Sequence, residues 1–314
     1  MKKITPLRLL SGVPALWLTL ALYLSACGPA AEGSLPVRTV TDPMGNTVQL
    51  SRPIERIISA APSNTEIIVD LGAGDRLIAV DKYSVNIPGV NRSLPAIDFM
   101  YPDGEAIIAL KPDLIIASEH NRVAGEDPFK LLRDMGIAVA YIPTGGGIEE
   151  IYRDIAFIAD LLEVPGRGEE LTAAMKEAVR GIARTGSGIK EKKTVYFEIS
   201  PPPYLVSFGR GTFLHEMLEI IGAENIFAGT TGWIAPGAEA IAAANPDVIL
   251  TNTVLPGGEN PVDELLRRPG FGGIRAVRNK AVYRIDTDAS SRPTHHIVRA
   301  LQEMARSVYP EYYE

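Results

Sequence analysis

Few side chains in this chain have the types and spacing that catalysis or metal binding requires. The 314 residues include four histidines and one cysteine. His295 and His296 are adjacent, but neighbours on a helix point about 100° apart, so the two rings are not expected to face one ion. We therefore predict no metal site. At least one of these two histidines is expected to have a structural role at the start of a helix. His295 and His120 remain candidates for residues that contact a ligand in a cleft.

Serine and nucleotide chemistry are poorly supported. Ser63 stands between an expected strand and an expected helix, but Pro62 and Asn64 replace the glycines of a G-x-S-x-G elbow. Helix N-capping by Ser63 or Asn64 explains the pattern more simply. The glycines of GAGDRL (72–77) follow a helix, where they end it, and a third glycine is missing. The sequence predicts no catalytic residue and no cofactor.

The most informative pattern is a repeat. Residues 105–118 read EAIIALKPDLIIAS and residues 239–252 read EAIAAANPDVILTN, with seven of fourteen positions identical at a separation of 134 residues. That separation is too long for a solenoid repeat and is about the length of one domain. The chain is therefore predicted to have two similar lobes, each presenting one equivalent glutamate, Glu105 and Glu239.

Alternating strand and helix patterns surround both copies of the repeat and predict α/β lobes with mostly parallel sheets. The first lobe is expected to have strands at 56–59, 76–80, 114–118 and 137–143, with helices at 65–71, 105–110 and 128–135. The second is expected to have strands at 194–200, 248–252 and 281–286, with helices at 212–221, 239–244, 262–268 and 293–308.

Between the lobes the strand pattern disappears. Residues 148–162 carry a helical stripe of apolar residues, Pro165-Gly166 is expected to break it, and residues 169–183 form a second helix. A long helix between two α/β lobes is predicted to be a stiff connector.

Aromatic and basic residues gather in loops that follow the predicted strands. Ligands of open α/β sheets bind outside the carboxyl ends of the strands, and exposed aromatics are costly unless something covers them. We therefore expect an aromatic-lined cleft between the lobes. Its candidate residues are Tyr83, Phe99 and Tyr101 from the first lobe, and Tyr204, Phe208, Trp233 and Arg292 from the second. Arg210 and Arg292 could supply charge to an anionic ligand.

The N-terminus has the pattern of an export signal. Lys2, Lys3 and Arg8 precede an apolar run, and Leu24-Ser25-Ala26 precedes Cys27. A cysteine after a small residue resembles the lipobox of bacterial lipoproteins, in which the thiol is acylated. We expect an extracytoplasmic protein anchored by lipid at Cys27, without structural disulfides.

The chain is acidic, with a net charge of −7, and removing the three basic residues before Cys27 leaves −10. A basic footprint for nucleic acid is absent. The predicted organisation is a signal peptide over 1–27, a tether and β-hairpin over 28–55, an N-terminal lobe over 56–164, a connecting helix over 165–190 and a C-terminal lobe over 191–314.

Three segments resemble a known family: RIISAAPSNTEIIVDLGAGDRLIAV (56–80), EAIIALKPDLIIAS (105–118) and GAENIF (222–227). They are similar to the periplasmic-binding-protein domain of iron-siderophore, haem and cobalamin importers, the class III solute-binding lipoproteins of ABC transporters. The resemblance covers roughly residues 56–309. It implies two α/β lobes, joined by one long helix, that hold the ligand between them and open only slightly.

The resemblance also implies roles for residues. Glu105 and Glu239 would dock onto arginines of the membrane permease, although each could instead be an acid favoured at a helix N-terminus. Tyr83, Phe99, Tyr204 and Trp233 fall where cobalamin binders place cleft aromatics, whereas Ser118 stands where those proteins can carry an aromatic. Arg292 falls in the last cleft loop, where siderophore binders often have a basic residue.

We therefore predict a monomeric binding lipoprotein without catalytic activity. It would capture a metal chelate, an iron-siderophore or a corrinoid first and haem third, and deliver it to an ABC permease and its ATPase. The alternatives are an extracytoplasmic α/β enzyme and a ligand-sensing lipoprotein without a permease.

Overall fold

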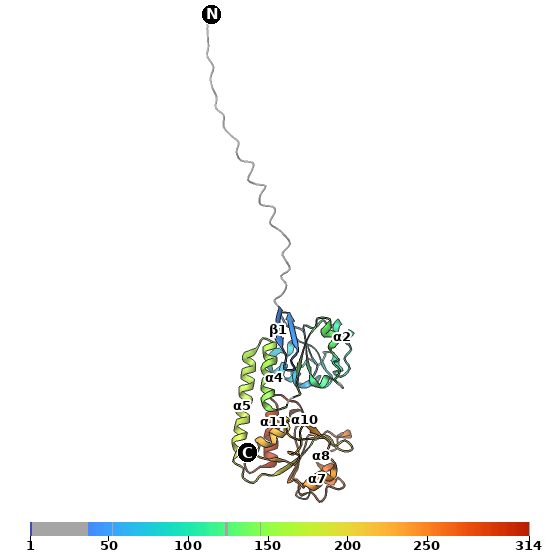
Figure 1. Cartoon of the computed structure of the whole chain (residues 1–314), viewed down its shortest axis with the longest axis vertical. Coiled ribbons are helices and arrows are strands. Elements are labelled where there is room, and N and C mark those ends of the chain that lie inside the picture. Colours follow the sequence, from blue (N-terminus) through green and yellow to red (C-terminus); the bar gives the residue numbers. More distant parts are fainter. Residues whose placement is uncertain (2–36, 52, 123–124, 145, 314) are drawn as a thin grey trace. The chain divides into compact units, whose positions relative to one another are not determined.

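Alternation of short apolar strands with helices produces two parallel sheets in the computed structural model, which describes Met1 and residues 37–51, 53–122, 125–144 and 146–313 (Figure 1). The predicted α/β class, with two lobes and a long helix, is confirmed. The signal peptide and Cys27 lie outside the described residues, and the lobe boundaries given above stay predictions.

The first sheet has five parallel strands in the order β5-β4-β3-β6-β7. These are β3 (Ile57–Ser59), β4 (Leu77–Asp81), β5 (Ala96–Ile97), β6 (Leu114–Ser118) and β7 (Ala138–Ile142). Every residue of β6 and β7 is buried, as expected for strands covered on both faces. Leu114 and Ile116 pack into one apolar cluster, and Ile115 and Ala117 pack into another.

Helices of the first lobe lie between these strands. They are α1 (Pro62–Ile68), the π-helical turn η1 (Val69–Ala73), η2 (Gly74–Arg76), α2 (Gly104–Ala109), η3 (Glu119–Asn121) and α3 (Lys130–Asp134). The helix expected over 65–71 thus begins earlier and ends in a π turn. Its N-cap is Ala61, with Pro62 in the first turn, so the predicted capping by Ser63 or Asn64 is wrong.

The second sheet has four parallel strands in the order β10-β8-β12-β13. These are β8 (Thr194–Glu198), β10 (Glu224–Asn225), β12 (Val248–Thr251) and β13 (Val282–Arg284). Two short strands, β9 (Ser207–Phe208) and β11 (Trp233–Ile234), pair antiparallel beside it. The sequence pattern did not predict β5, β9, β10 or β11, because two residues are too few to show a period.

The helices of the second lobe surround this sheet. They are α6 (Phe213–Ile220), α7 (Ala238–Ala244), η4 (Pro256–Gly258), α8 (Pro261–Arg267), α9 (Arg275–Arg278), α10 (Thr287–Ser291) and α11 (Ile297–Val308). The helix expected over 293–308 therefore begins only at Ile297, and the segment before it is a turn that follows α10.

Two helices connect the lobes, α4 (Ile148–Leu161) and α5 (Pro165–Ser187). Pro165 stands in the first turn of α5, where its missing N–H costs nothing, so it begins this helix, whereas α4 has already ended at Leu161. Helix α5 contacts α4 and η1 at one end and α6 and α11 at the other (Figure 1). A Cβ on Gly186 would lie 2.1 Å from the carbonyl oxygen of Ile220, so this close contact with the second lobe requires glycine.

An antiparallel hairpin occupies the segment predicted as one, with β1 (Val37–Thr41) and β2 (Thr47–Ser51). Asp42 in its turn is buried, and its Oδ2 accepts a hydrogen bond from the Tyr141 N–H of β7 at 2.8 Å. The turn is thus fixed to the first sheet.

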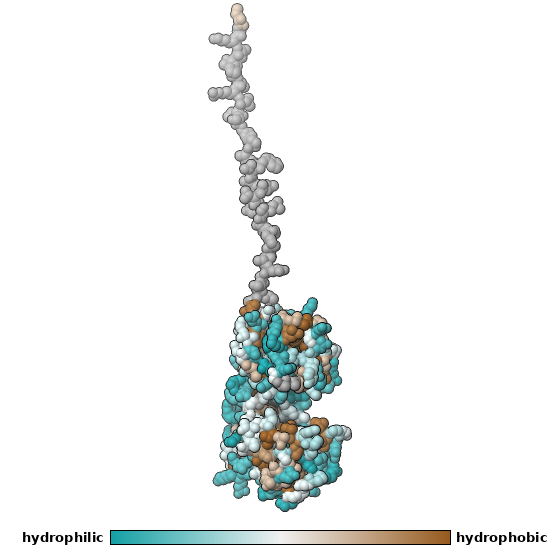
Figure 2. Space-filling view, turned by 45° about the vertical axis from the view of Figure 1, so that its right-hand side comes forward, coloured by the Kyte–Doolittle hydropathy of each residue, from teal (hydrophilic) through white to brown (hydrophobic). Residues whose placement is uncertain are grey.

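The surface mixes apolar and polar residues. On the face shown in Figure 2, apolar residues lie in small groups among hydrophilic ones on both lobes. Within the described parts of the chain, no helix has both the length and the apolarity to cross a bilayer.

Candidate functional site

All five strands of the first sheet contribute a following loop to one cavity of about 490 Å³. The lining residues are Ala61, Pro62 and Ser63 after β3, Tyr83 after β4, Phe99 and Met100 after β5, Ser118 at the end of β6 with His120 and Asn121 after it, and Pro143 and Thr144 after β7. Asp288, Ser291, Arg292 and Pro293 complete it from the second lobe. This is the carboxyl edge at which open α/β sheets bind ligands.

A second cavity of about 250 Å³ continues the first toward the second lobe. Its additional lining residues are Ile199, Phe213, Leu214, Trp233, Asn252 and Ser290. His120, Thr144, Ser291 and Pro293 line both cavities. We call the two together the cleft.

A larger cavity of about 780 Å³ lies elsewhere. Lys193, Asp247 and Ala281 line it, and these residues directly precede β8, β12 and β13. It therefore opens at the amino edge of the second sheet, where α/β proteins do not usually bind their ligands.

Asn121 fixes three of the cleft loops to one another. Its Oδ1 accepts from the Ser118 N–H at 2.6 Å, and its Nδ2 donates to the carbonyls of Ala60 at 3.0 Å and Phe99 at 3.1 Å. Because Asn121 is fully buried, these hydrogen bonds are protected from water. They fix the positions of the loops after β3, β5 and β6 relative to one another.

The aromatic side chains of the cleft stand in edge-to-face pairs. The Tyr83 and Phe99 rings are 5.8 Å apart at 62°. In the second lobe, Trp233 packs edge-on against Phe208 at 6.3 Å and Phe213 at 6.4 Å, yet about half of its surface is exposed. A tryptophan ring that packs against two phenylalanines on one side and is exposed on the other presents a flat apolar face to a ligand.

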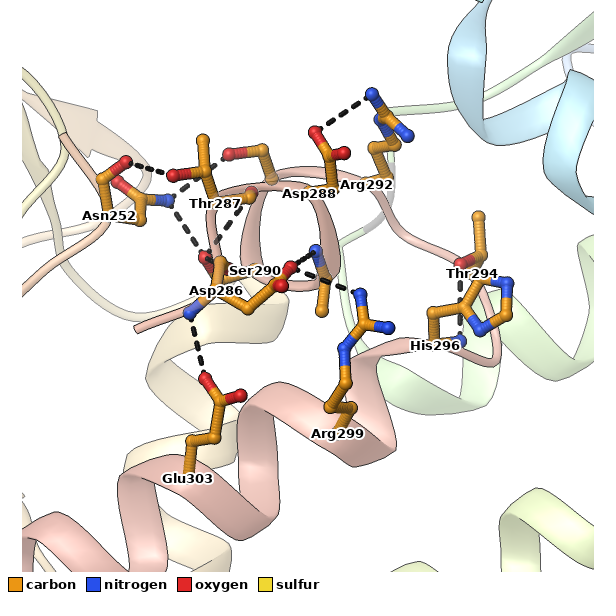
Figure 3. Close-up of polar contacts among 12 residues, drawn as sticks. Asn252, Asp286, Thr287, Asp288, Ser290, Arg292, Thr294, His296, Arg299 and Glu303 are labelled. Carbon is orange, nitrogen blue, oxygen red and sulfur yellow. Dashed lines mark hydrogen bonds and ion pairs between the residues drawn. The ribbon is translucent and has the colours of Figure 1, made fainter. Parts of the chain in front are cut away.

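Helix α10 supplies the second-lobe side of the cleft and is held from several directions (Figure 3). Asn252 Nδ2 donates to Ser290 Oγ at 3.0 Å, and Thr287 Oγ1 donates to the Asn252 carbonyl at 2.8 Å. The N-cap Asp286 accepts from the Ala289 N–H at 2.7 Å, and its own N–H donates to Glu303 at 2.7 Å. The cleft wall is thereby pre-organised.

Arg292 joins the two lobes. Its guanidinium forms an ion pair with the buried Glu66 of α1 and a second with Asp288 at 2.8 Å. Thr294 Oγ1 also donates to Glu66, at 3.1 Å. Two carboxylates therefore already neutralise the guanidinium, which leaves little charge for a ligand.

One turn further along, Asp70 meets both histidines. The Nε2 atoms of His295 and His296 each lie 3.0 Å from Asp70 Oδ2. The expectation that the rings point apart is wrong, because both residues precede α11 and occupy a turn. Hydrogen bonds from the two imidazoles lower the pKa of Asp70 well below its usual range, and the bond to Asp70 raises the pKa of His296.

The predicted site residues thus separate into groups. Tyr83, Phe99, Trp233 and Arg292 line the cleft, as does His120. Partial burial lowers the pKa of His120. Tyr101 lines a neighbouring cavity of about 360 Å³, which shares Met100 and Asn121 with the cleft.

The remaining candidates lie outside the cleft lining. His295 belongs to the Asp70 group, and Tyr204 is largely exposed in the loop after β8. Arg210 is exposed beside β9. Glu105 and Glu239 are exposed in the first turns of α2 and α7, on different lobes.

Sequence reasoning missed the residues that organise the cleft, above all Glu66, Asp70, Asn121 and Asn252. A signal was available for the last two, because Asn252 directly follows β12 and Asn121 lies three residues after β6, at the edge where ligands bind. For Glu66 and Asp70 the available signal was their spacing of four on a helix, which places both on one face. Their partners lie more than 220 residues away, which no local pattern indicates.

Comparisons with known proteins agree with this geometry. A family model described as periplasmic binding protein matches residues 57–289. The chain is 31% identical to the uncharacterized ABC transporter substrate-binding lipoprotein YvrC of Bacillus subtilis (strain 168), over 96% of this chain and 98% of that protein.

Two further proteins are similar over most of the chain. The vitamin B12-binding protein of Vibrio parahaemolyticus is 27% identical, over 81% of this chain and 89% of its own. The crystal structure of a possible iron-binding, periplasmic solute-binding protein of Staphylococcus epidermidis superposes with a TM-score of 0.71 and 31% identity, over 81% of this chain and 98% of that one.

Proposed function

Because the chain belongs to the periplasmic binding protein family, we propose that its cleft captures a metal chelate and delivers it to an ABC importer. The observation that carries this proposal is the convergence of all five loops of the first sheet with Trp233 and α10 of the second lobe. Such a cleft can enclose a bulky ligand on both sides, with flat aromatic faces toward it.

Membership of this family makes the chain a binding protein and not an enzyme. A substrate-binding protein of an ABC transporter works with a membrane permease, an ATPase and a small ligand. The cleft residues accordingly need only bind and release.

The charge of the cleft favours a chelate close to neutral. Arg292 is the only arginine or lysine among the described lining residues, and Glu66 and Asp288 already pair with it. A highly anionic ligand would have to break these pairs, which would leave buried carboxylates uncompensated. A corrinoid or an uncharged iron-siderophore therefore fits better than an anionic chelate, and haem, with its carboxylates, ranks third.

Glu105 and Glu239 suit the docking of each lobe onto the permease. Both are exposed, and the carboxylate of neither forms a hydrogen bond or ion pair with another described side chain. Asp103 caps α2 through its Oδ1, so Glu105 is not needed for that purpose. An unpaired surface carboxylate can accept an arginine bidentately and set the orientation of the complex.

We further propose that Cys27 carries a lipid anchor on the outer side of the membrane. The sequence before it supports export, and the Bacillus subtilis relative is described as a lipoprotein. Acylation would keep the binding protein near its permease without a membrane-spanning helix. Loss of the protein from the membrane fraction in a Cys27→Ala variant would support this anchor, and full retention there would contradict it.

Purification from the native host tests the proposal. We expect the protein to retain a chelate with a visible absorbance band, identified by mass spectrometry, and the yield of chelate to fall at least tenfold in Trp233→Ala and Tyr83→Ala. Tyr312→Ala serves as the matched control, because this exposed tyrosine lies outside the cleft. Equal retention of the chelate by all four proteins would contradict the proposed cleft.

A further inference from the structure

The Asp70, His295 and His296 side chains form a cluster that chelate binding in the cleft does not use. The three candidate ligand atoms, one carboxylate oxygen and two imidazole nitrogens, all lie within 4.8 Å of one another. Neither histidine lines the cleft. Asp70 belongs to η1 of the first lobe, whereas the histidines belong to the turn before α11 of the second.

Neighbouring contacts hold this cluster in place. Thr294 donates to Glu66, one helical turn before Asp70, and accepts from the His296 N–H at 3.2 Å. The two imidazole rings lie side by side, with centroids 4.1 Å apart and planes tilted by 41°. Figure 3 shows Thr294 and His296 together in the turn that precedes α11. Both rings are thus fixed with Nε2 toward the same carboxylate oxygen.

The geometry is close to that of a three-ligand metal site. Ligand atoms about 2.0–2.1 Å from one tetrahedral ion stand about 3.3 Å apart. Each Nε2 is 3.0 Å from Asp70 Oδ2, so a small outward movement of the rings would admit an ion between the three atoms. Two imidazoles with one carboxylate suit Zn²⁺ and its first-row neighbours, whereas Mg²⁺ and Ca²⁺ prefer oxygen ligands alone.

Accessibility also fits an exchangeable ion. The Asp70 and His296 side chains are each 37% exposed, while the His295 side chain is 13% exposed. An ion could enter from the exposed side and keep a water molecule in the fourth position. The Nδ1 atom of His295 is buried and has no hydrogen-bond partner among the described residues, so the ring makes its polar contact at this cluster through Nε2.

We propose that Asp70, His295 and His296 bind a divalent transition-metal ion, Zn²⁺ being the best match, at a site separate from the chelate cleft. The ion would connect the first lobe to the turn that carries Arg292 and Pro293 into the cleft. Its occupation would therefore stabilise the arrangement of the cleft wall, by mass action on the state that binds it.

Isothermal titration of the purified protein with ZnCl₂, in the absence of any chelate, tests this site. We expect one saturable site per chain, with the dissociation constant raised at least tenfold in Asp70→Asn and in His296→Gln. Asp75→Asn and His215→Gln are the matched controls and should bind Zn²⁺ as the wild type does. Co²⁺ in place of Zn²⁺ should give the visible bands of a tetrahedral ion.

Two results would overturn the proposal. One is the lack of a saturable site in the wild type; the other is equal affinity in Asp70→Asn, His296→Gln and the controls. Far-ultraviolet circular dichroism checks that each variant is folded, and the more exposed His296 provides the milder change. Because no chelate is present in this titration, a negative result would not bear on the proposal of chelate capture. A negative result for chelate capture would likewise not bear on the proposed metal site.

Discussion

The two copies of the repeat, α2 to β6 in the first lobe and α7 to β12 in the second, differ in an instructive way (Figure 1). Their second halves share a Pro-Asp pair that performs the same structural task through different partner residues. Their first halves share a glutamate, two alanines and an isoleucine. The isoleucines, Ile107 and Ile241, are buried in the core, whereas the glutamate side chains perform no evident structural task.

The turn after each helix is the same. Lys111 has φ of 50° and Asn245 has φ of 48°, both in the left-handed region, and each precedes a Pro-Asp pair. Asparagine adopts this conformation readily. For lysine the left-handed conformation costs roughly 1–2 kcal/mol of stability. Asn245 gives a further contact, because its Oδ1 accepts from the Arg275 N–H at 2.8 Å.

The aspartate of each Pro-Asp pair fixes the neighbouring strand. Asp113 accepts from the N–H groups of Glu55 and Arg56, just before β3, at 2.9 and 2.8 Å. Asp247 accepts from the N–H and the hydroxyl of Thr194, at the start of β8, at 2.9 and 2.8 Å, and also pairs with Arg275. Strand pairing therefore explains why Pro-Asp is repeated, whereas it does not explain Glu105 or Glu239.

The largest expected effect concerns these glutamates. Charge reversal in the double variant Glu105→Arg/Glu239→Arg should lower uptake of the chelate at least tenfold, because each arginine would face the arginines proposed on the permease and lose 2–5 kcal/mol of pairing. Uptake by cells that carry only the variant measures this loss.

Chelate affinity and the free energy of unfolding should stay close to the wild type, within about 0.5 kcal/mol. Glu169→Arg, on the exposed face of α5, is the control for added charge. Unchanged uptake by the double variant would exclude docking and favour a ligand sensor without a permease.

The aspartates should matter for stability, and unequally. Asp247→Ala should lower the free energy of unfolding by about 2–3 kcal/mol, since partly buried donors lose their acceptor, and Asp113→Ala by about 1 kcal/mol, since its bonds are exposed. Urea denaturation measures both. Equal losses would mean that burial does not distinguish the two copies.

The same aspartate predicts a pH dependence. Burial opposes ionisation of Asp247, but the hydrogen bonds from Thr194 and the charge of Arg275 outweigh it and lower its pKa. Its contribution is therefore present above pH 3.8, the ordinary pKa, and is lost as the pH falls through the lowered pKa. Between pH 4 and pH 2 the free energy of unfolding should therefore fall less in Asp247→Asn than in the wild type. An equal fall in the two proteins would contradict this prediction.

The smallest effect should be opposite in the two turns. Lys111→Gly should raise the free energy of unfolding by about 1 kcal/mol, because glycine relieves the left-handed conformation. Asn245→Gly should lower it by about 1 kcal/mol, because the bond to the Arg275 N–H is lost. Thermal unfolding of the two variants compares them directly, and a shift of the same sign in both would refute this difference.

The repeat made the fold predictable, because strands such as 114–118 are long, apolar and bounded by Pro-Asp. The expectation that loop aromatics face the cleft holds for Tyr83, Phe99 and Trp233, although Trp233 itself belongs to the short strand β11. The pairing of Glu66 with Arg292 and of Asp70 with His295 could not be predicted, because it depends on how the lobes are arranged. The assumption that His295 stands on a helix hid the second of these.

Trp233 offers the most direct test of chelate capture. Of the two tryptophans, Trp17 lies in the predicted signal peptide, so the protein processed at Cys27 would contain Trp233 alone. Its fluorescence should change saturably on titration with cobalamin or an uncharged ferric siderophore, more strongly than with an anionic ferric catecholate, and Trp233→Phe should show no signal. No saturable change with cobalamin, haemin or either ferric siderophore would contradict the account.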